Sequence, residues 1–207
     1  VGKVKRNDPI VFNFPAGDTV VVENQATAYY EIVRSTAREM QARYNYGSRN
    51  PMPVQYFMTM ARNDVRENNT IIYRPVDRRD NYVKRCIALP GDTVLIKSGT
   101  VFVNNEKVPE SEGQQTTYIV VTNGTTINPK AFERLKISKE DQVMISGSAY
   151  QLPLTKKNAE AISKFTNVTS VSALYESPGK FVPWIFPYKP QLGWNDDNFG
   201  PLWIPRK

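Results

Sequence analysis

The chain has 207 residues and a net charge of +7, with 40% hydrophobic and 23% charged residues, a composition ordinary for a globular protein. It contains no histidine, which excludes a histidine base, and its single cysteine, Cys86, excludes an internal disulfide and argues against a zinc site. Lysine is then the side chain that most commonly serves as a base near neutral pH, apart from a buried carboxylate. No run of about 18 apolar residues occurs, so we expect no membrane-spanning segment in these residues.

The first part of the chain predicts a hairpin followed by two helices. Residues 3–15 have the pattern of a strand that ends at a turn, and residues 19–22 are expected to return antiparallel beside it. Apolar residues then recur at spacings of three and four, first over about 27–44 and again after Pro53, which predicts two helices. We expect their apolar stripes to form core: Tyr29, Val33, Ala37, Met40 and Tyr44 in the first, and Val54, Phe57, Met58, Ala61 and Val65 in the second.

Residues 80–89 predict a strand that ends at the turn Pro90-Gly91-Asp92. Side chains alternate along a strand, which gives two sets: Tyr82, Lys84 and Cys86 on one face, and Val83, Arg85 and Ile87 on the other. We expect Lys84 to be partly desolvated beside Tyr and Cys, which lowers the pKa of a lysine; a change from about 10.4 to about 8 costs roughly 3 kcal/mol. A neutral lysine can accept the proton of a serine hydroxyl. The commoner interpretation is a strand lysine whose stem lies on apolar surface and whose ammonium is in water.

The second half of the chain mixes strand and helix signals. Strands are expected at 93–97, 100–103 and 118–121, with a short return at 107–108, and helices are expected after two caps, Asn128 with Pro129, and Thr155. Residues 177–194 are rich in proline and aromatic residues, and we expect an ordered loop packed on the preceding region. A partner-binding surface is the alternative for this aromatic loop.

The run Tyr82-Val83-Lys84-Arg85-Cys86-Ile87-Ala88-Leu89-Pro90-Gly91-Asp92 resembles the Tyr-Ile-Lys-Arg-x-x-Gly-Leu-Pro-Gly-Asp box of bacterial type I signal peptidases. Two further segments resemble this family, in the same order along the chain. Residues 6–15 are similar to its Arg-Gly-Asp-x-Val-Val-Phe-x-x-Pro strand, and residues 198–205 are similar to a Gly-Pro-x-x-Val-Pro strand of its longer members. The serine box, Ser-Met-x-Pro, and the Gly-Asp-Asn-Arg box do not occur, so we expect an internal fragment of a longer enzyme whose serine lies outside this chain.

The resemblance implies hydrolysis of preproteins after the signal peptide, by a Ser/Lys dyad in which Lys84 is the general base. It implies that Asp80, Asn81, Tyr82 and Val83 contact the substrate and that Arg85 has a structural role near the site. It implies no metal and no cofactor. The expected location is the bacterial cytoplasmic membrane, with the catalytic domain on the periplasmic side, and the fragment alone is expected to be inactive.

The predicted fold class is α+β, an antiparallel catalytic-core portion with mixed insertions. The predicted division is a partial β core at 1–25 and 70–108, a helical insertion at 26–69, an α+β lid insertion at 109–197, and a strand at 198–207 that returns to the core. A non-catalytic binding or assembly module that uses the aromatic loop 177–194 is the alternative function. A self-cleaving repressor-type protein is a third option, against which the absence of a helix-turn-helix pattern weighs.

Basic residues cluster at 3–6, 74–85 and 156–157. A solvated surface of mixed charge explains this as well as a partner does. Anionic lipid headgroups are the partner that we favour, because the resemblance places the protein at a membrane surface. Nucleic acid is not an expected partner, since neither a basic recognition helix nor a binding motif is present.

Overall fold

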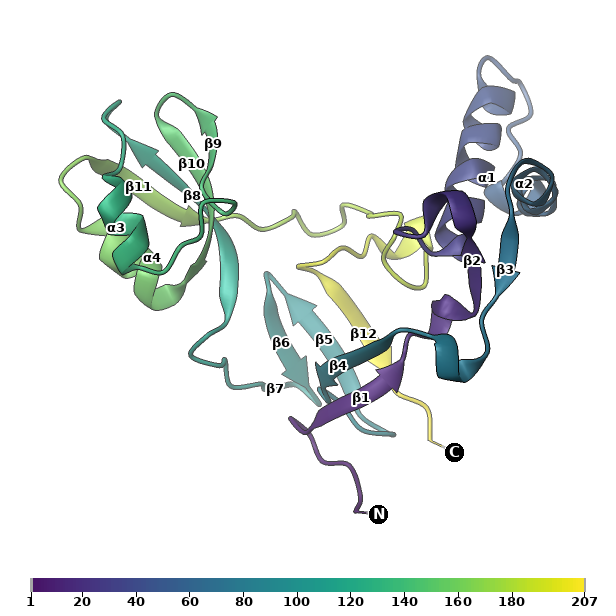
Figure 1. Cartoon of the computed structure of the whole chain (residues 1–207), viewed down its shortest axis with the longest axis horizontal. Helices are drawn as coiled ribbons and strands as arrows, with labels where there is room; N and C mark the ends of the chain where they lie inside the picture. The colour runs from purple at the N-terminus through teal and green to yellow at the C-terminus, as the bar shows by residue number, and fades with distance from the viewer. Residues whose placement is uncertain (1, 207) are drawn as a thin grey trace. The chain divides into compact units, whose positions relative to one another are not determined.

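A computed structural model of the chain describes residues 2–206 and shows an α+β protein (Figure 1). The chain divides into two compact units, Val1–Ile87 and Ala88–Lys207, which we describe separately. The first unit contains β1 (Pro9–Asn13), β2 (Thr19–Val21), α1 (Tyr29–Asn45), α2 (Val54–Asn68), β3 (Ile71–Tyr73) and β4 (Asn81–Arg85), together with 3-10 helices η1 (Pro15–Asp18), η2 (Val22–Asn24) and η3 (Val76–Arg78).

The strands of the first unit form two separate antiparallel pairs, β1 with β4 and β2 with β3. The predicted hairpin between the first strand and residues 19–22 is therefore wrong. A 3-10 helix, η1, occupies the expected turn, and β2 then pairs with β3 across the whole helical segment. The local turn signal was correct, but a turn does not determine which strand lies beside the next one.

The two predicted helices are confirmed as α1 and α2, which pack against each other and against β2. Their shared core contains Val21, Tyr29, Val33, Ala37, Phe57, Ala61 and Val65. The prediction that Tyr44 belongs to this core is wrong, because Tyr44 is 55% exposed. Tyr44 lies in the last turn of α1, where its ring contacts Phe57 with 5.5 Å between the ring centroids.

The second unit contains two four-stranded antiparallel sheets. The first, in the order β12-β5-β6-β7, includes the predicted hairpin of β5 and β6, and the second has the order β11-β8-β10-β9. Their elements are β5 (Thr93–Lys97), β6 (Thr100–Val103), β7 (Glu106–Lys107), β8 (Gln115–Thr122), α3 (Pro129–Arg134), β9 (Val143–Ser146), β10 (Ala149–Thr155), α4 (Lys156–Ser163), β11 (Val168–Ala173), η4 (Pro190–Leu192) and β12 (Phe199–Trp203).

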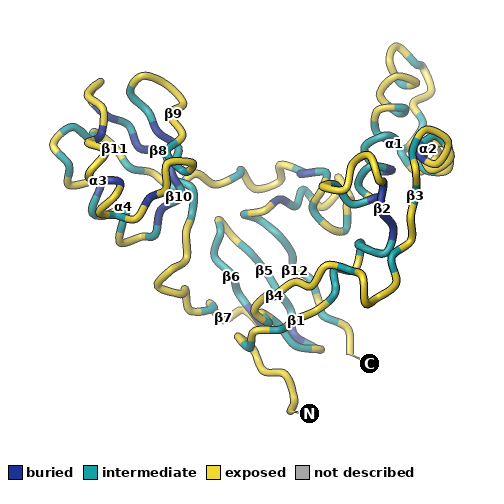
Figure 2. The backbone as a smooth tube through the Cα atoms, viewed as in Figure 1, coloured by how far each residue is buried: buried dark blue, intermediate teal, exposed yellow. Residues whose placement is uncertain are grey.

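Two helices and the second sheet enclose the core of this unit, which Figure 2 shows as buried segments of β8, β10, α3 and α4. Val120, Leu152, Leu154 and Ile162 are fully buried there. Both predicted caps are confirmed: the Asn128 side chain accepts from the Lys130 N–H at 2.9 Å, and the Thr155 hydroxyl accepts from the Asn158 N–H at 3.1 Å. Each cap satisfies a backbone donor that would otherwise lack a partner in the first turn of a helix.

Three strands of this sheet were not predicted, namely β9, β10 and β11. Pro153 lies within β10, and a proline normally argues against an inner strand. The structure accommodates it because β9 pairs with β10 only as far as Gln151, so no neighbour needs the missing donor of Pro153.

An ion-pair cluster links the start of α4 to the chain before β8. The Glu110 carboxylate lies 2.5 Å from Lys156 Nζ and 3.1 Å from Lys107 Nζ. Hydrogen bonds lower the pKa of Glu110 below its usual value of 4.5, and the bond from Lys156 contributes more than the bond from Lys107. Because the pKa is lowered in the folded state, this stabilisation is present above about pH 4.5 and is lost as the pH falls through the lowered pKa.

We expect Glu110→Gln to lower the melting temperature slightly at pH 7 and to reduce the difference in stability between pH 7 and pH 3. The effect is small because water screens these exposed groups. Thermal unfolding of both proteins at the two pH values measures it, with Glu112→Gln as the control, since Glu112 is an exposed acidic residue with no ion pair in the described structure. An equal loss of stability on acidification in the wild type and in Glu110→Gln would contradict this prediction.

Candidate active site

Lys84 lies in β4, directly opposite Ile10 of β1. Opposite residues of an antiparallel pair share a face. On this face, the centroid of the Tyr82 ring lies 6.3 Å from that of Phe12 and 5.1 Å from that of Phe14. The predicted alternation is therefore confirmed on this face. Lys84 lies on the same side of the sheet as this aromatic cluster, which leaves apolar surface beside its stem.

The predicted partial burial of Lys84 is wrong for the described structure, in which every residue of β4 is exposed. Strands β1 and β4 form a sheet of two strands, and neither contributes a buried residue to the two cores of the described chain. Burial of a strand residue requires a second layer on its face, and the alternation of the sequence does not reveal whether that layer exists.

The outer edge of β4 carries free main-chain groups. The Phe14 N–H donates to Asp80 O and the Cys86 N–H donates to Asp8 O, so the even-numbered residues of this strand direct their backbone toward β1. In an antiparallel pair, the backbone N–H and C=O groups of alternate residues point away from the partner strand. In β4 these residues are Asn81, Val83 and Arg85. β4 has no second neighbouring strand within residues 2–206. This edge has the hydrogen-bonding groups that an extended peptide needs.

The other predicted site residues lie along the same strand. Asp80 immediately precedes β4, and the Asn81 side chain accepts from Asn13 Nδ2 at 2.9 Å, which fixes the start of the β1–β4 pair. Arg85 donates to the side-chain amide oxygen of Asn7, Oδ1, at 3.2 Å. Asn7 has a φ of 73°, a conformation that asparagine tolerates better than most residues, and the Arg85 contact holds that turn at the start of β1.

The Leu-Pro-Gly-Asp end of the lysine run forms a closed turn in the second unit. Asp92 is buried, and its carboxylate accepts from the Leu89 N–H at 2.7 Å and from Asn104 Nδ2 at 2.9 Å. Gly91 has a φ of 94°, which disfavours any other residue, and its N–H donates to Ile204 O. The sequence pattern after Lys84 therefore has a structural role, which is to join β5 to the end of β12.

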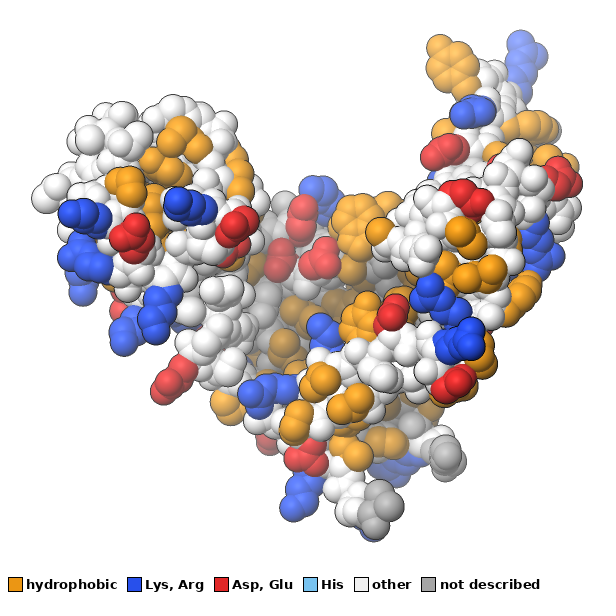
Figure 3. Space-filling model, viewed as in Figure 1, with side chains coloured by type: hydrophobic (Ala, Val, Ile, Leu, Met, Phe, Trp, Pro, Cys, Tyr) orange, Lys and Arg blue, Asp and Glu red, His pale blue; other side chains and the backbone are white. Residues whose placement is uncertain are grey.

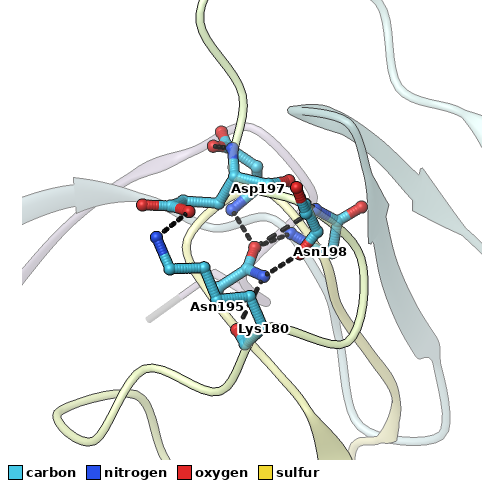
Figure 4. Close-up of polar contacts among 6 residues, drawn as sticks. Lys180, Asn195, Asp197 and Asn198 are labelled. Atoms are coloured by element: carbon cyan, nitrogen blue, oxygen red, sulfur yellow. Dashed lines mark hydrogen bonds and ion pairs between the residues drawn. The ribbon is translucent and has the colours of Figure 1, made fainter.

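A second polar cluster, which the sequence did not reveal, holds the aromatic loop 177–194. Asn195 is fully buried and donates through Nδ2 to Ser177 O and Lys180 O, both at 3.0 Å (Figure 4). Its Oδ1 accepts from the N–H groups of Asp197 at 3.1 Å and Asn198 at 2.8 Å. One side chain thus ties both ends of the loop together. A lone asparagine in a polar stretch is not a recognisable signal for this role.

Further hydrogen bonds join the two ends of the loop to each other and its second end to the β5–β6 turn. The Glu176 N–H donates to Asp197 Oδ2 at 2.7 Å, and the Ser98 N–H donates to Asn198 Oδ1 at 3.2 Å. The loop is ordered, as predicted, and Val182 is buried within it. Trp184 and Phe186 are instead 61% and 56% exposed, so the expected packing applies to only part of the loop.

Comparison with known proteins decides the family. The family described as signal peptidase, peptidase S26, matches residues 1–183. The chain belongs to the signal peptidase family. Neither the search of curated proteins nor that of solved structures found a match.

Membership of this family makes the protein one of the signal peptidases, a membrane-associated group of peptidases that act on preproteins bearing signal peptides. Its fold class, α+β, agrees with the prediction. Within residues 2–206 of this signal peptidase, no helix is long and apolar enough to cross a membrane. Within the same residues, no group of three or more acidic, Cys or His side chains is placed to hold a metal ion.

Proposed function

We propose that this signal peptidase hydrolyses preproteins with a Ser/Lys dyad in which Lys84 is the general base. The position of Lys84 carries the proposal, because it lies within a strand, β4, whose outer edge is open to an extended peptide. The serine attacks the scissile carbonyl, Lys84 takes its proton and gives it to the leaving amine, and an oxyanion hole stabilises the tetrahedral intermediate. Water, deprotonated by Lys84, then cleaves the acyl-serine ester, and the proton returns to the serine oxygen.

The proposed substrate adds a strand beside β4. Outward main-chain groups of Asn81 and Val83 would bond the peptide backbone, while side chains of Asp80 and Tyr82 would contact its side chains. Main-chain bonding accepts many sequences, which suits a peptidase that cleaves different preproteins. The cut would follow a small-x-small pattern, in which two small residues are separated by one residue of any kind. Arg85 acts on the fold through Asn7.

The environment of Lys84 would be completed by the substrate and by the serine-bearing segment. A lysine is a base only as the neutral amine, and burial favours the neutral form over the ammonium. Lys84 is exposed in the described structure, so we propose that both partners cover this face of β4 during the reaction. We propose that the serine lies in sequence outside residues 1–207, since no Ser-Met-x-Pro motif occurs among them. We further propose that the enzyme acts at the periplasmic side of a bacterial cytoplasmic membrane.

The test is cleavage of a preprotein by the complete enzyme, with the new N-terminus identified by mass spectrometry. We expect a single cut after the small-x-small pattern and no cut when the last small residue of the substrate is replaced by phenylalanine. The reading frame around this chain should also encode a Ser-Met-x-Pro box. A complete enzyme that lacks this serine, or that cuts both substrates equally, would exclude the proposal.

A binding or assembly module is the second candidate, and the exposure of Trp184 and Phe186 on an ordered loop favours it. Exposed aromatic residues held by a fixed backbone are typical of protein-binding surfaces. Replacement of both by serine distinguishes the two candidates. A binding module would lose its function, whereas an enzyme that uses Lys84 would keep its cleavage of a short peptide.

A further inference from the structure

The free end of the α1–α2 hairpin exposes aromatic and basic side chains together. We call this region the hairpin tip, formed by Arg43, Tyr44, Tyr46, Arg49 and Tyr56. Tyr46 is 91% exposed and Tyr56 is 54% exposed, and both arginines are exposed. Figure 3 shows hydrophobic and basic side chains projecting at this end of the hairpin. None of these five residues belongs to the buried core of the hairpin.

The tip is held in a fixed shape. The Asn45 side chain bonds both backbone groups of Met52, accepting from its N–H at 2.8 Å and donating to its oxygen at 3.0 Å. The Gln41 side chain donates to the same oxygen at 3.0 Å. Gly47, with a φ of 69°, turns the chain directly after Tyr46. The exposure of Tyr46 is therefore imposed by an ordered loop.

The charge around the tip has one sign. Residues 40–60 contain two arginines, Arg43 and Arg49, and no acidic residue. Arg43 and Arg49 make no ion pair with the residues that the structure describes. Arg34 and Arg38, which lie nearer the start of α1, both pair with Glu31 at 2.7 Å. The basic residues of the tip are thus available to an external anion.

Tyrosine and arginine together favour one kind of surface. Tyrosine is enriched where a bilayer meets water, because its ring is apolar and its hydroxyl is polar. Arginine near an anionic leaflet is attracted to lipid headgroups. We propose that the hairpin tip binds the surface of an anionic bilayer and so holds the first unit against the membrane. This inference rests on the proposed function only in placing the protein beside a membrane.

The test is flotation of the 207-residue chain with two kinds of vesicle. One kind contains phosphatidylcholine alone, and the other also contains about 30% phosphatidylglycerol so that it resembles an anionic leaflet. We expect the wild-type chain to bind the anionic vesicles. In the double variant Arg43→Gln/Arg49→Gln, the partition coefficient should fall about fivefold for each arginine removed. Tyr46→Ala should also weaken binding severalfold. The control is Arg62→Gln/Arg66→Gln, which removes the same charge from exposed positions of α2 away from the tip.

The outcomes separate the possible partners. Equal losses in the tip and control variants would show a general effect of net charge and overturn the proposal. Binding of poly(dT) that depends on the tip, with vesicle binding that does not, would also overturn it in favour of nucleic acid. Cleavage of a soluble peptide by the complete enzyme does not depend on the tip, so failure here leaves the catalytic proposal standing.

Discussion

Lys84→Ala in the complete enzyme is expected to lower the rate of preprotein cleavage by about a thousandfold or more, since a positioned general base contributes 10²–10⁴-fold. The free energy of unfolding should change by less than about 0.5 kcal/mol, because Lys84 is exposed on β4. Initial rates with a preprotein, and denaturant unfolding of the same samples, measure the two quantities. Loss of activity without loss of stability distinguishes a chemical role from a structural one.

Two further variants sharpen this test. Lys84→Arg keeps the positive charge and the long stem but cannot supply a neutral base, so we expect it to be as inactive as the alanine variant. Lys97→Ala removes an exposed lysine at the end of another strand, β5, and should leave the rate unchanged. Activity retained by Lys84→Ala would rule out Lys84 as the base.

Asn195→Ala is expected to destabilise the protein by about 2–3 kcal/mol, because it leaves two carbonyl oxygens and two N–H groups without the partner that they share. Asn195→Asp should be similarly damaging. It retains an acceptor for the N–H groups but directs a second oxygen at the two carbonyl oxygens. Denaturant unfolding measures both changes.

Loss of this cluster should also release the aromatic loop, so we expect limited proteolysis to cut within 177–194 faster in both variants. Asn63→Ala is the matched control, since Asn63 is exposed on α2 and the same side-chain change there should alter stability by less than about 0.5 kcal/mol. A loop that resists protease equally in Asn195→Ala and in the wild type would show that other contacts hold it.

The sequence predicted those elements whose signals are local. Helices α1 and α2 follow from apolar periodicity, and α3 and α4 from Asn128 and Thr155, whose side chains act within their own first turns. The β5–β6 hairpin follows from a two-residue turn at Ser98 and Gly99. Each of these structures is determined by residues close together in the chain.

The features that the sequence did not predict depend on distant contacts. β2 pairs with β3 across two helices, and β10 accepts Pro153 because its neighbour ends early. Lys84 could be placed on a face of its strand, but the exposure of that face depends on what packs there. The role of Asn195 depends on four backbone groups contributed by both sides of a loop. Alternation and composition carry no information about such partners.

The isolation of the β1–β4 pair has a consequence for its dynamics. A sheet of two strands without buried residues has little to stabilise it, so its amides should exchange with solvent through local opening rather than through unfolding of either core. A peptide that adds a third strand would then order the pair as it binds. Part of the free energy of substrate binding would be used to assemble the strand that carries Lys84, so peptides that bond its edge poorly would be cleaved slowly as well as bound weakly.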